Sequence, residues 1–371
     1  MQEKTENVIR MYEKVVYYDP ANPWDWDILS SLYNDIGNMS KARDAALRIK
    51  KIAQNDSEHL MAASVLGRVQ MDDDDLAGAA ESYRQSLTIT ERLARANPKD
   101  VMLRRKLAHL EGSEQLINIM ERSAKGEDVQ EQLTVALGHF RQYLTLTERL
   151  IRGDPNNAKL QEDMSGIFMV IGSIQAMQAN ITGATESYRQ SLTITERLAK
   201  ENPDDLRLQH LLSTSLDIFG HIQMVQGDPV GALDSYSRSL ATTELLVKGS
   251  SNDVMLQSRL SASFGYIGNA QMAQGDLTSA IERYHQSLTI AENLARSDPG
   301  NAELQYDVAT SYQRLADAGV PGFTWERVRL HLQAMKNQGI FKPSYEDFLA
   351  EAAENAAREQ GTPSVLDNQQ P

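Results

Sequence analysis

Three groups of residues have types and spacings that could do chemistry. The four aspartates at 72–75 could attract a divalent cation, although they lack the spaced ligands and central glycine of an EF-hand loop; the alternative is a solvated loop before a helix. His210 and His221 fall on nearly the same side of one predicted helix, where they could sense pH, bind a ligand or have no special task. The basic group at 104–106 (RRK) could meet phosphate, but its apolar flanks at helical spacing favour a solvated helix face.

Motifs for nucleophilic, phosphate-binding and zinc chemistry are missing from the sequence. GxxxxGK[ST], GxGxxG, HExxH and GxSxG do not occur, there is no cysteine, and the 7 histidines lack metal-ligand spacing. We therefore expect no enzymatic activity, no cofactor and no metal site. The net charge of −14 disfavours nucleic acid as a partner.

The sequence also bears on location. The first residues show no signal peptide, and the most apolar run, residues 167–174, is too short to cross a bilayer. A chain without cysteine fits a reducing compartment. We expect a cytoplasmic protein without membrane insertion.

A repeat is the dominant feature of the sequence. The stretch ESYRQSLTITERLA occurs at 81–94 and again at 186–199. Residues recur at a step of 48, namely Tyr188, Tyr236 and Tyr284, and Gly172, Gly220 and Gly268. Phe140 precedes Tyr188 by the same step, whereas Tyr83 precedes Phe140 by 57, and the surplus falls in a polar stretch at 124–132 that predicts a longer loop. Such self-similarity is typical of structural units that pack against copies of themselves.

Each unit is predicted to be two antiparallel helices. Apolar residues in 188–199 recur at i, i+3/i+4 and i+7, which forms one stripe of an α-helix. Gly-Asp at 227–228 and 275–276 predicts the end of one helix and the N-cap of the next, and Asp-Pro or Asn-Pro breaks the second helix. Glycine inside a helix costs about 1 kcal/mol, so three in register indicate a close approach of two helices.

The sequence resembles the tetratricopeptide repeat family on residues of both its early and its late units. The early positions that follow the family pattern are Trp26, Leu29, Ser30, Tyr33, Gly37, Ala42 and Ala46, and the later ones are Ile267, Gly268, Ala280 and Tyr284. The step of 48 exceeds the family's usual 34, as in the long-helix variant common in bacterial multidomain signalling proteins and in repeats similar to those of kinesin light chains. The resemblance implies an all-α, right-handed superhelical solenoid of antiparallel helix pairs, with C-terminal capping helices.

The predicted organisation has four parts. Residues 1–56 form units of ordinary length, 57–318 form long-helix repeats, 319–360 form capping helices, and 361–371 form a disordered tail. The last capping helix is expected at 344–359, with Ser344 as its N-cap. Residues 8–18 resemble a second helix without a first one, so they either cap the array or begin inside a longer array that carries an upstream effector domain. We expect the latter.

The resemblance also implies a binding surface. First helices line the concave face of the family's superhelix, and their contact positions include here Met169, Ser173, Asp217, His221, Met224, Asn269 and Met272. Met177, which lies just beyond these positions in its helix, joins the predicted set. Methionines suit an adaptable apolar surface, although they equally suit gaps between long helices. Family members that clamp a C-terminal carboxylate use lysine, asparagine and arginine; among these positions only Asn269 is of such a type.

The functional expectation is therefore a non-catalytic scaffold that binds a peptide or a partner protein in the concave groove of the solenoid. The alternative is a regulatory or sensor arm of a larger signalling protein whose N-terminal effector domain is absent from this chain. Self-association remains a further option for the partner.

Overall fold

The computed structural model describes residues 2–73, 75–123, 125–250 and 253–361, and these residues form α-helices, one short 3-10 helix and connecting turns, without a strand. They divide into two compact units, Met1–Leu198 and Ala199–Pro371. The first unit contains α1 (Gln2–Tyr18), α2 (Pro23–Asp35), α3 (Met39–Ile52), α4 (Asp56–Asp72), α5 (Leu76–Ala96), α6 (Val101–Ser123), α7 (Gln130–Gly153), α8 (Ala158–Met177) and most of α9 (Ile181–Glu201). The second contains α10 (Leu206–Val225), α11 (Pro229–Gly249), α12 (Val254–Ala273), α13 (Leu277–Ser297), α14 (Ala302–Asp317), α15 (Trp325–Asn337), the 3-10 helix η1 (Pro343–Tyr345) and α16 (Glu346–Gly361).

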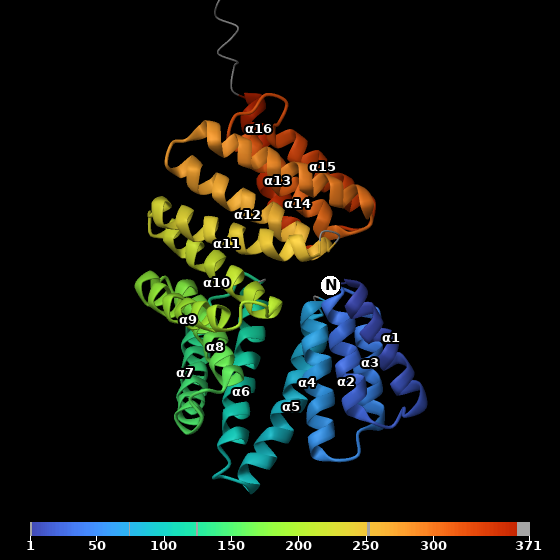
Figure 1. Ribbon diagram of the computed structural model, residues 1–371. Helices are drawn as coiled ribbons and strands as arrows, with labels where there is room; N and C mark the ends of the chain where they lie inside the picture. The colour runs from blue at the N-terminus through green and yellow to red at the C-terminus, as the bar shows by residue number, and fades with distance from the viewer. Residues whose placement is uncertain (1, 74, 124, 251–252, 362–371) are drawn as a thin grey trace, which may run out of the picture. The chain divides into compact units, whose positions relative to one another are not determined.

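Consecutive helices pack against one another in antiparallel pairs within each unit (Figure 1). The predicted all-α architecture of helix pairs is therefore confirmed. The tight turns use the predicted residues: Gly227 and Gly275 have φ of 76° and 83°, and Asp228 and Asp276 cap the helices that follow. Their carboxylates accept hydrogen bonds from backbone N–H groups that have no partner inside the helix.

In four of the long pairs an aromatic ring rests closely on a glycine of the facing helix. A Cβ added to that glycine would come within 2.6 Å of the ring in Gly172–Tyr188 and within 2.5 Å in Gly220–Tyr236 and Gly268–Tyr284. Gly112 has the same relation to Phe140, at 2.7 Å. Equivalent residues thus lie in equivalent surroundings, which confirms the repeat. The glycines are there because the two backbones approach too closely for any larger residue.

Serines and glutamines add hydrogen bonds at matching positions of the pairs. Ser187 donates to Gln175 Oε1 over 2.7 Å, and Ser235 donates to Gln223 Oε1 over the same distance. Ser165 and Ser191 are joined at 2.8 Å. Because these hydroxyls are buried or half-buried, the bonds satisfy groups that would otherwise be costly to remove from water.

First helices of successive pairs also touch each other, as α2 touches α4, α10 touches α12, and α12 touches α14. In each unit we call the side formed by these first helices the first-helix wall of that unit. The wall of the first unit consists of α2, α4, α6 and α8, and the wall of the second consists of α10, α12 and α14. These are the surfaces on which the sequence places the partner-binding residues.

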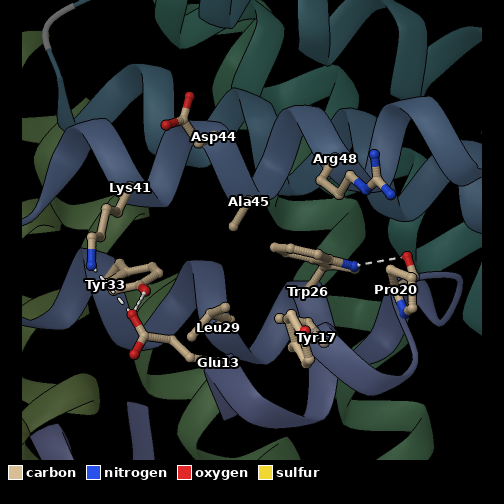
Figure 2. Close-up of a pocket in the computed structure, with 11 residues that line it drawn as sticks. Glu13, Tyr17, Pro20, Trp26, Leu29, Tyr33, Lys41, Asp44, Ala45 and Arg48 are labelled. Carbon is tan, nitrogen blue, oxygen red and sulfur yellow. Dashed lines mark hydrogen bonds and ion pairs between the residues drawn. The ribbon is translucent and has the colours of Figure 1, made fainter. Parts of the chain in front are cut away.

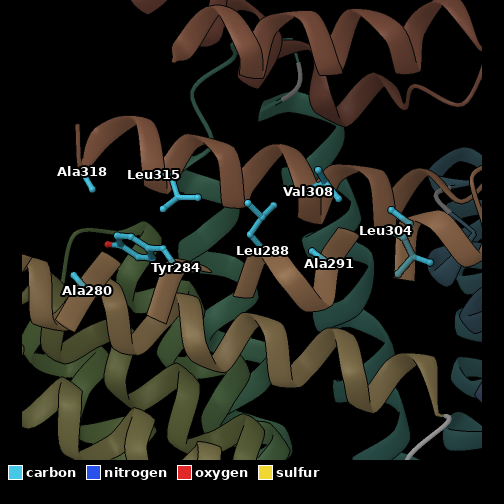
Figure 3. Packing of buried hydrophobic residues seen from close by; sticks show 9 residues of the cluster. Ala280, Tyr284, Leu288, Ala291, Leu304, Val308, Leu315 and Ala318 are labelled. Carbon is cyan, nitrogen blue, oxygen red and sulfur yellow. The ribbon is translucent and has the colours of Figure 1, made fainter. Parts of the chain in front are cut away.

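The C-terminal helices cover the end of the second unit. Buried residues of α13 and α14, among them Tyr284, Leu288 and Leu315, form one cluster (Figure 3). A second cluster joins α14 to α15 and α16 through Trp325, Leu332 and other buried residues. The predicted start of the last helix is wrong by two residues, because Ser344 lies inside the 3-10 helix and α16 begins at Glu346. The predicted tail lies outside the described residues apart from position 361.

Candidate functional site

Three of the predicted wall residues contact the buried tyrosine of their own pair. Ser173 accepts a hydrogen bond from the hydroxyl of Tyr188 over 3.1 Å, and Asn269 accepts one from Tyr284 over 3.0 Å. His221 instead places its ring edge-on to Tyr236, with ring centroids 5.4 Å apart. This position therefore has a packing task within the pair. Ser173 and His221 remain exposed.

Asp217 is buried and bound to the neighbouring first helix. Its Oδ2 lies 3.4 Å from Nη2 of Arg259, which also donates to Thr214 Oγ1 over 2.5 Å. Burial raises the pKa of Asp217, since the loss of hydration outweighs the nearby hydroxyl and guanidinium groups. Asp217 and Arg259 thus join α10 to α12, which leaves Asp217 poorly placed as a freely accessible contact for a partner.

The methionines divide between interior and surface. Met224 and Met272 pack against buried clusters of the second unit, Met169 is half-buried, and Met177 is 50% exposed. Gap filling therefore describes Met224 and Met272 well, and Met177 is the methionine of this set most open to contact. The first-unit residues Met169, Ser173 and Met177 all lie on α8, and the other five predicted residues lie on α10 and α12.

A cation that is attracted by Asp307 but makes no close ion pair with the described residues lies on the first-helix wall of the second unit. Arg314 of α14 crosses Gly265 of α12, where an added Cβ would come within 2.3 Å of Nη1. Its guanidinium lies 6.0 Å from the ring centroid of Tyr266. Within the described part of the chain, the side chain of Arg314 has no hydrogen bond or ion pair, and Asp307 is instead bound by Ser258 over 2.6 Å. Burial lowers the pKa of Arg314, which shows that its charge is held at a cost.

The basic group in α6 is not a uniformly solvated face, so that interpretation is wrong. Arg104 is exposed, but Arg105 is only 9% exposed and donates to Asp163 of α8 over 2.5 Å. Arg105 also donates to Thr147 over 2.9 Å and to Tyr143 over 3.2 Å. Successive residues on a helix point about 100° apart, so one basic run reaches solvent and a buried ion pair at once.

Lys106, the third member of the group, reaches a pocket on the first-helix wall. The pocket has a volume of about 380 Å³ and lies between α2, α4 and α6, with one residue from α5. Its lining residues are Trp24, Asp27, Ser57, Leu60, Met61, Ser64, Val65, Arg68, Leu93, Leu103 and Lys106. A mostly apolar cavity with a few charged groups is the usual form of a ligand site.

The next turn of α6 carries a histidine that titrates far below its ordinary range. Burial, followed by the charges of Lys106 and Arg105, lowers the pKa of His109 to about 4, against the weaker opposite effect of Asp163. Because the unfolded chain then binds more protons between about pH 4 and 6.5, the free energy of unfolding should fall as the pH falls through that window.

Between pH 7 and pH 4.5, the free energy of unfolding of the His109→Gln variant should fall by about 1–2 kcal/mol less than that of the wild type. The reason is that the variant lacks the proton uptake by His109 on unfolding. Urea denaturation at the two pH values measures the difference. The matched control is His59→Gln, at an exposed histidine. If His109→Gln and His59→Gln show the same acid sensitivity, His109 is not the titrating group.

A second pocket, of about 630 Å³, lies between α1, α2 and α3 on the opposite side of α2 (Figure 2). Its floor is apolar, with Leu29 and Ala45, and some of its polar groups have partners, whereas Nε of Arg48 has no hydrogen-bond partner among the described residues. Tyr33 donates to Glu13 over 2.5 Å, and the indole of Trp26 donates to the backbone oxygen of Pro20 over 3.1 Å. The guanidinium of Arg48 lies 5.9 Å from the ring centroid of Trp26.

Metal and membrane sites find no support in the described residues. No cluster of three or more metal-ligating side chains occurs among them, and Arg43 binds both Asp73 at 2.7 Å and Asp75 at 3.2 Å in the acidic run. The described helices also include none with the length and apolar content needed to cross a bilayer.

Comparison with known proteins places the fold. No protein-family model and no curated protein matches the chain. A solved structure that does match is the signal transduction ATPase with numerous domains (STAND) protein with a tetratricopeptide repeat sensor from Pyrococcus horikoshii, with a TM-score of 0.56 and 14% identity over 94% of this chain and 46% of that one. The fold is that of a tetratricopeptide-type helical solenoid. A Rap protein complexed with competence and sporulation factor also matches, with a TM-score of 0.50 and 11% identity over 96% of this chain and 97% of that one.

At such identities the likeness shows the fold alone, and this chain spans less than half of the STAND protein. Apart from Lys106, which belongs to the basic group at 104–106, the candidate site rests on residues that the sequence pattern did not single out. They are Trp24, Asp27 and Arg68 in the first unit, and Arg259, Tyr266 and Arg314 in the second. A tetratricopeptide-type register marks packing positions, so charged residues between those positions carried no signal of their own.

Proposed function

We propose that the chain is a non-catalytic interaction module that binds a peptide or a partner protein on a first-helix wall. One observation carries the proposal: each unit has a cationic side chain on its own wall, Lys106 in the first and Arg314 in the second, that forms no ion pair with the described residues, although burial makes both charges costly. A chain normally pairs such charges, and a binding surface is where an unpaired one is retained for a ligand. Acceptor groups of a partner would complete the site.

The Arg314→Met variant tests this proposal. Methionine has a similar length and no charge, so removal of a half-buried cation that makes no close ion pair with the described residues should leave the melting temperature unchanged or raise it. Capture of partners from the native cell, measured by affinity purification and quantitative mass spectrometry, should fall about tenfold for proteins that depend on this contact.

The control for Arg314→Met is Arg296→Met, an exposed arginine on the second helix α13 whose side chain bonds within its own helix. The control should recover the same proteins as the wild type. Identical capture by Arg314→Met and the wild type would contradict a role for this part of the wall.

A regulatory or sensor arm is a second candidate. It is favoured by the match to the STAND protein, which has a tetratricopeptide repeat sensor. We include a cytoplasmic location in both proposals. A reading frame that continues upstream of Met1 into an effector domain would support the sensor arm, and a stop codon directly upstream would count against it.

A further inference from the structure

The pocket at Lys106 has a shape suited to a side chain of a partner. Apolar residues of α4 and α6, including Leu60, Met61 and Leu103, line its interior. Trp24 of α2 stands at the pocket with 60% of its surface exposed, which is unusual for so large an apolar side chain. A volume of about 380 Å³ accommodates one or two side chains rather than a whole folded element.

The charges around the pocket do not balance. Asp27 lies 3.8 Å from Nη2 of Arg68, so its carboxylate already faces one cation. Lys106 forms no hydrogen bond or ion pair through its side chain in the part of the chain that is described. Burial lowers the pKa of Lys106 and raises that of Asp27. The attraction between these two side chains therefore does not fully offset their loss of hydration. Asp27 attracts both Arg68 and Lys106, so two cations share one carboxylate, and the ammonium group of Lys106 has no hydrogen-bond acceptor among the described residues.

We propose that this pocket binds a segment of a partner polypeptide that places one aspartate or glutamate carboxylate on Lys106 and an adjacent apolar side chain against Trp24 and Leu60. The proposal rests on the proposed function and names the chemistry of its ligand. A polypeptide is favoured over nucleic acid because the chain carries a net charge of −14, which repels a polyanion, whereas a single carboxylate complements a single local cation.

Selection from a displayed library of random nonapeptides against the full chain tests the proposal without a known partner. The wild type should enrich peptides in which an acidic residue stands next to an apolar or aromatic one. The Lys106→Gln variant should lose the acidic preference, and Lys106→Arg should keep it, because arginine retains the charge. The matched control is Arg104→Gln, an exposed neighbour on the same helix with the same change in charge.

The affinity of one enriched peptide then measures how much the contact between its acidic residue and Lys106 contributes to binding. Replacement of its acidic residue by glutamine should weaken binding to the wild type about tenfold and should leave binding to Lys106→Gln almost unchanged. Melting temperatures check that Lys106→Gln and Lys106→Arg are folded, as expected because the side chain of Lys106 makes no hydrogen bond or ion pair within the described residues. Three results would overturn the proposal: no enriched peptide, no acidic preference, or a preference that Lys106→Gln retains.

Failure here is distinguishable from failure of the proposed function. If Arg314→Met loses partner capture while the peptide selection fails, the wall of the second unit binds a partner and the Lys106 pocket of the first unit does not. If both tests fail, neither first-helix wall is the binding surface.

Discussion

Replacing Gly172 by alanine should lower the free energy of unfolding by about 2 kcal/mol, even though alanine is the better helix former by about 1 kcal/mol. The added Cβ would come within 2.6 Å of the ring of Tyr188, a buried side chain with no room to move away. The two helices of the pair must then separate or the ring must leave its rotamer. Urea denaturation followed by circular dichroism measures the loss.

The same helix offers a matched control. Gly166 of α8 has no atom within 4 Å of an added Cβ, so Gly166→Ala should stabilise the protein by up to about 1 kcal/mol. In a double-mutant cycle, Tyr188→Leu should recover much of the loss caused by Gly172→Ala, because the smaller side chain makes space for the Cβ. Equal effects of the two glycine substitutions would show that ring contact is not what requires glycine here.

The Arg105→Leu variant should lose about 3 kcal/mol of unfolding free energy, the largest effect expected from a single charged residue of this chain. It removes the main cationic partner of Asp163 and leaves two polar groups, Thr147 and Tyr143, without a donor. Arg104→Leu, one residue earlier on an exposed face, should change stability by less than about 0.5 kcal/mol.

Substitution of Asp163, the ion-pair partner of Arg105, shows whether Arg105 stabilises the protein through its charge or through its packing. Asp163→Leu combined with Arg105→Leu should be much closer to the wild type than Arg105→Leu alone, since no uncompensated charge then remains. Lys159 lies 3.5 Å from Asp163 and offsets part of its charge in the single variant. A double variant as unstable as Arg105→Leu would mean that the guanidinium acts mainly through its packing against Tyr143, whose ring centroid lies 4.9 Å away.

The helix pairs could be predicted from the sequence because the residues that make the local contacts recur in several repeats. The tyrosine and glycine of each pair recur at one step, and the Gly-Asp turns recur with them, so a period of 48 residues revealed both the helices and the close contact between them. One exception is informative. At the position that matches Gly227, residue 179 is alanine and still adopts a φ of 58°, so the turn geometry is kept without its preferred residue.

The candidate site was only partly predictable, because its charges act across helices rather than along them. Ser173 and Asn269 occupy the same position of their repeats and were expected to face a partner. Each of them also accepts a hydrogen bond from the hydroxyl of a tyrosine on the second helix of its pair. Arg105 and Asp163 are far apart in sequence and meet only because α6 packs beside α8. No periodicity in one chain indicates which cation finds such an acceptor and which, like Arg314, does not.

The basic run in α6 has a consequence for how this helix tolerates change in length. Three successive basic residues point in different directions around the helix: Arg104 toward water, Arg105 toward Asp163 and Lys106 toward the pocket. Deletion of one residue early in α6 would rotate the following side chains by about 100°. Lysine would then meet Asp163, Leu107 would enter the pocket, and an arginine would point outward. A gene that accepts many substitutions at Arg104 should therefore reject single-codon deletions beside it, although the composition of the helix would hardly differ.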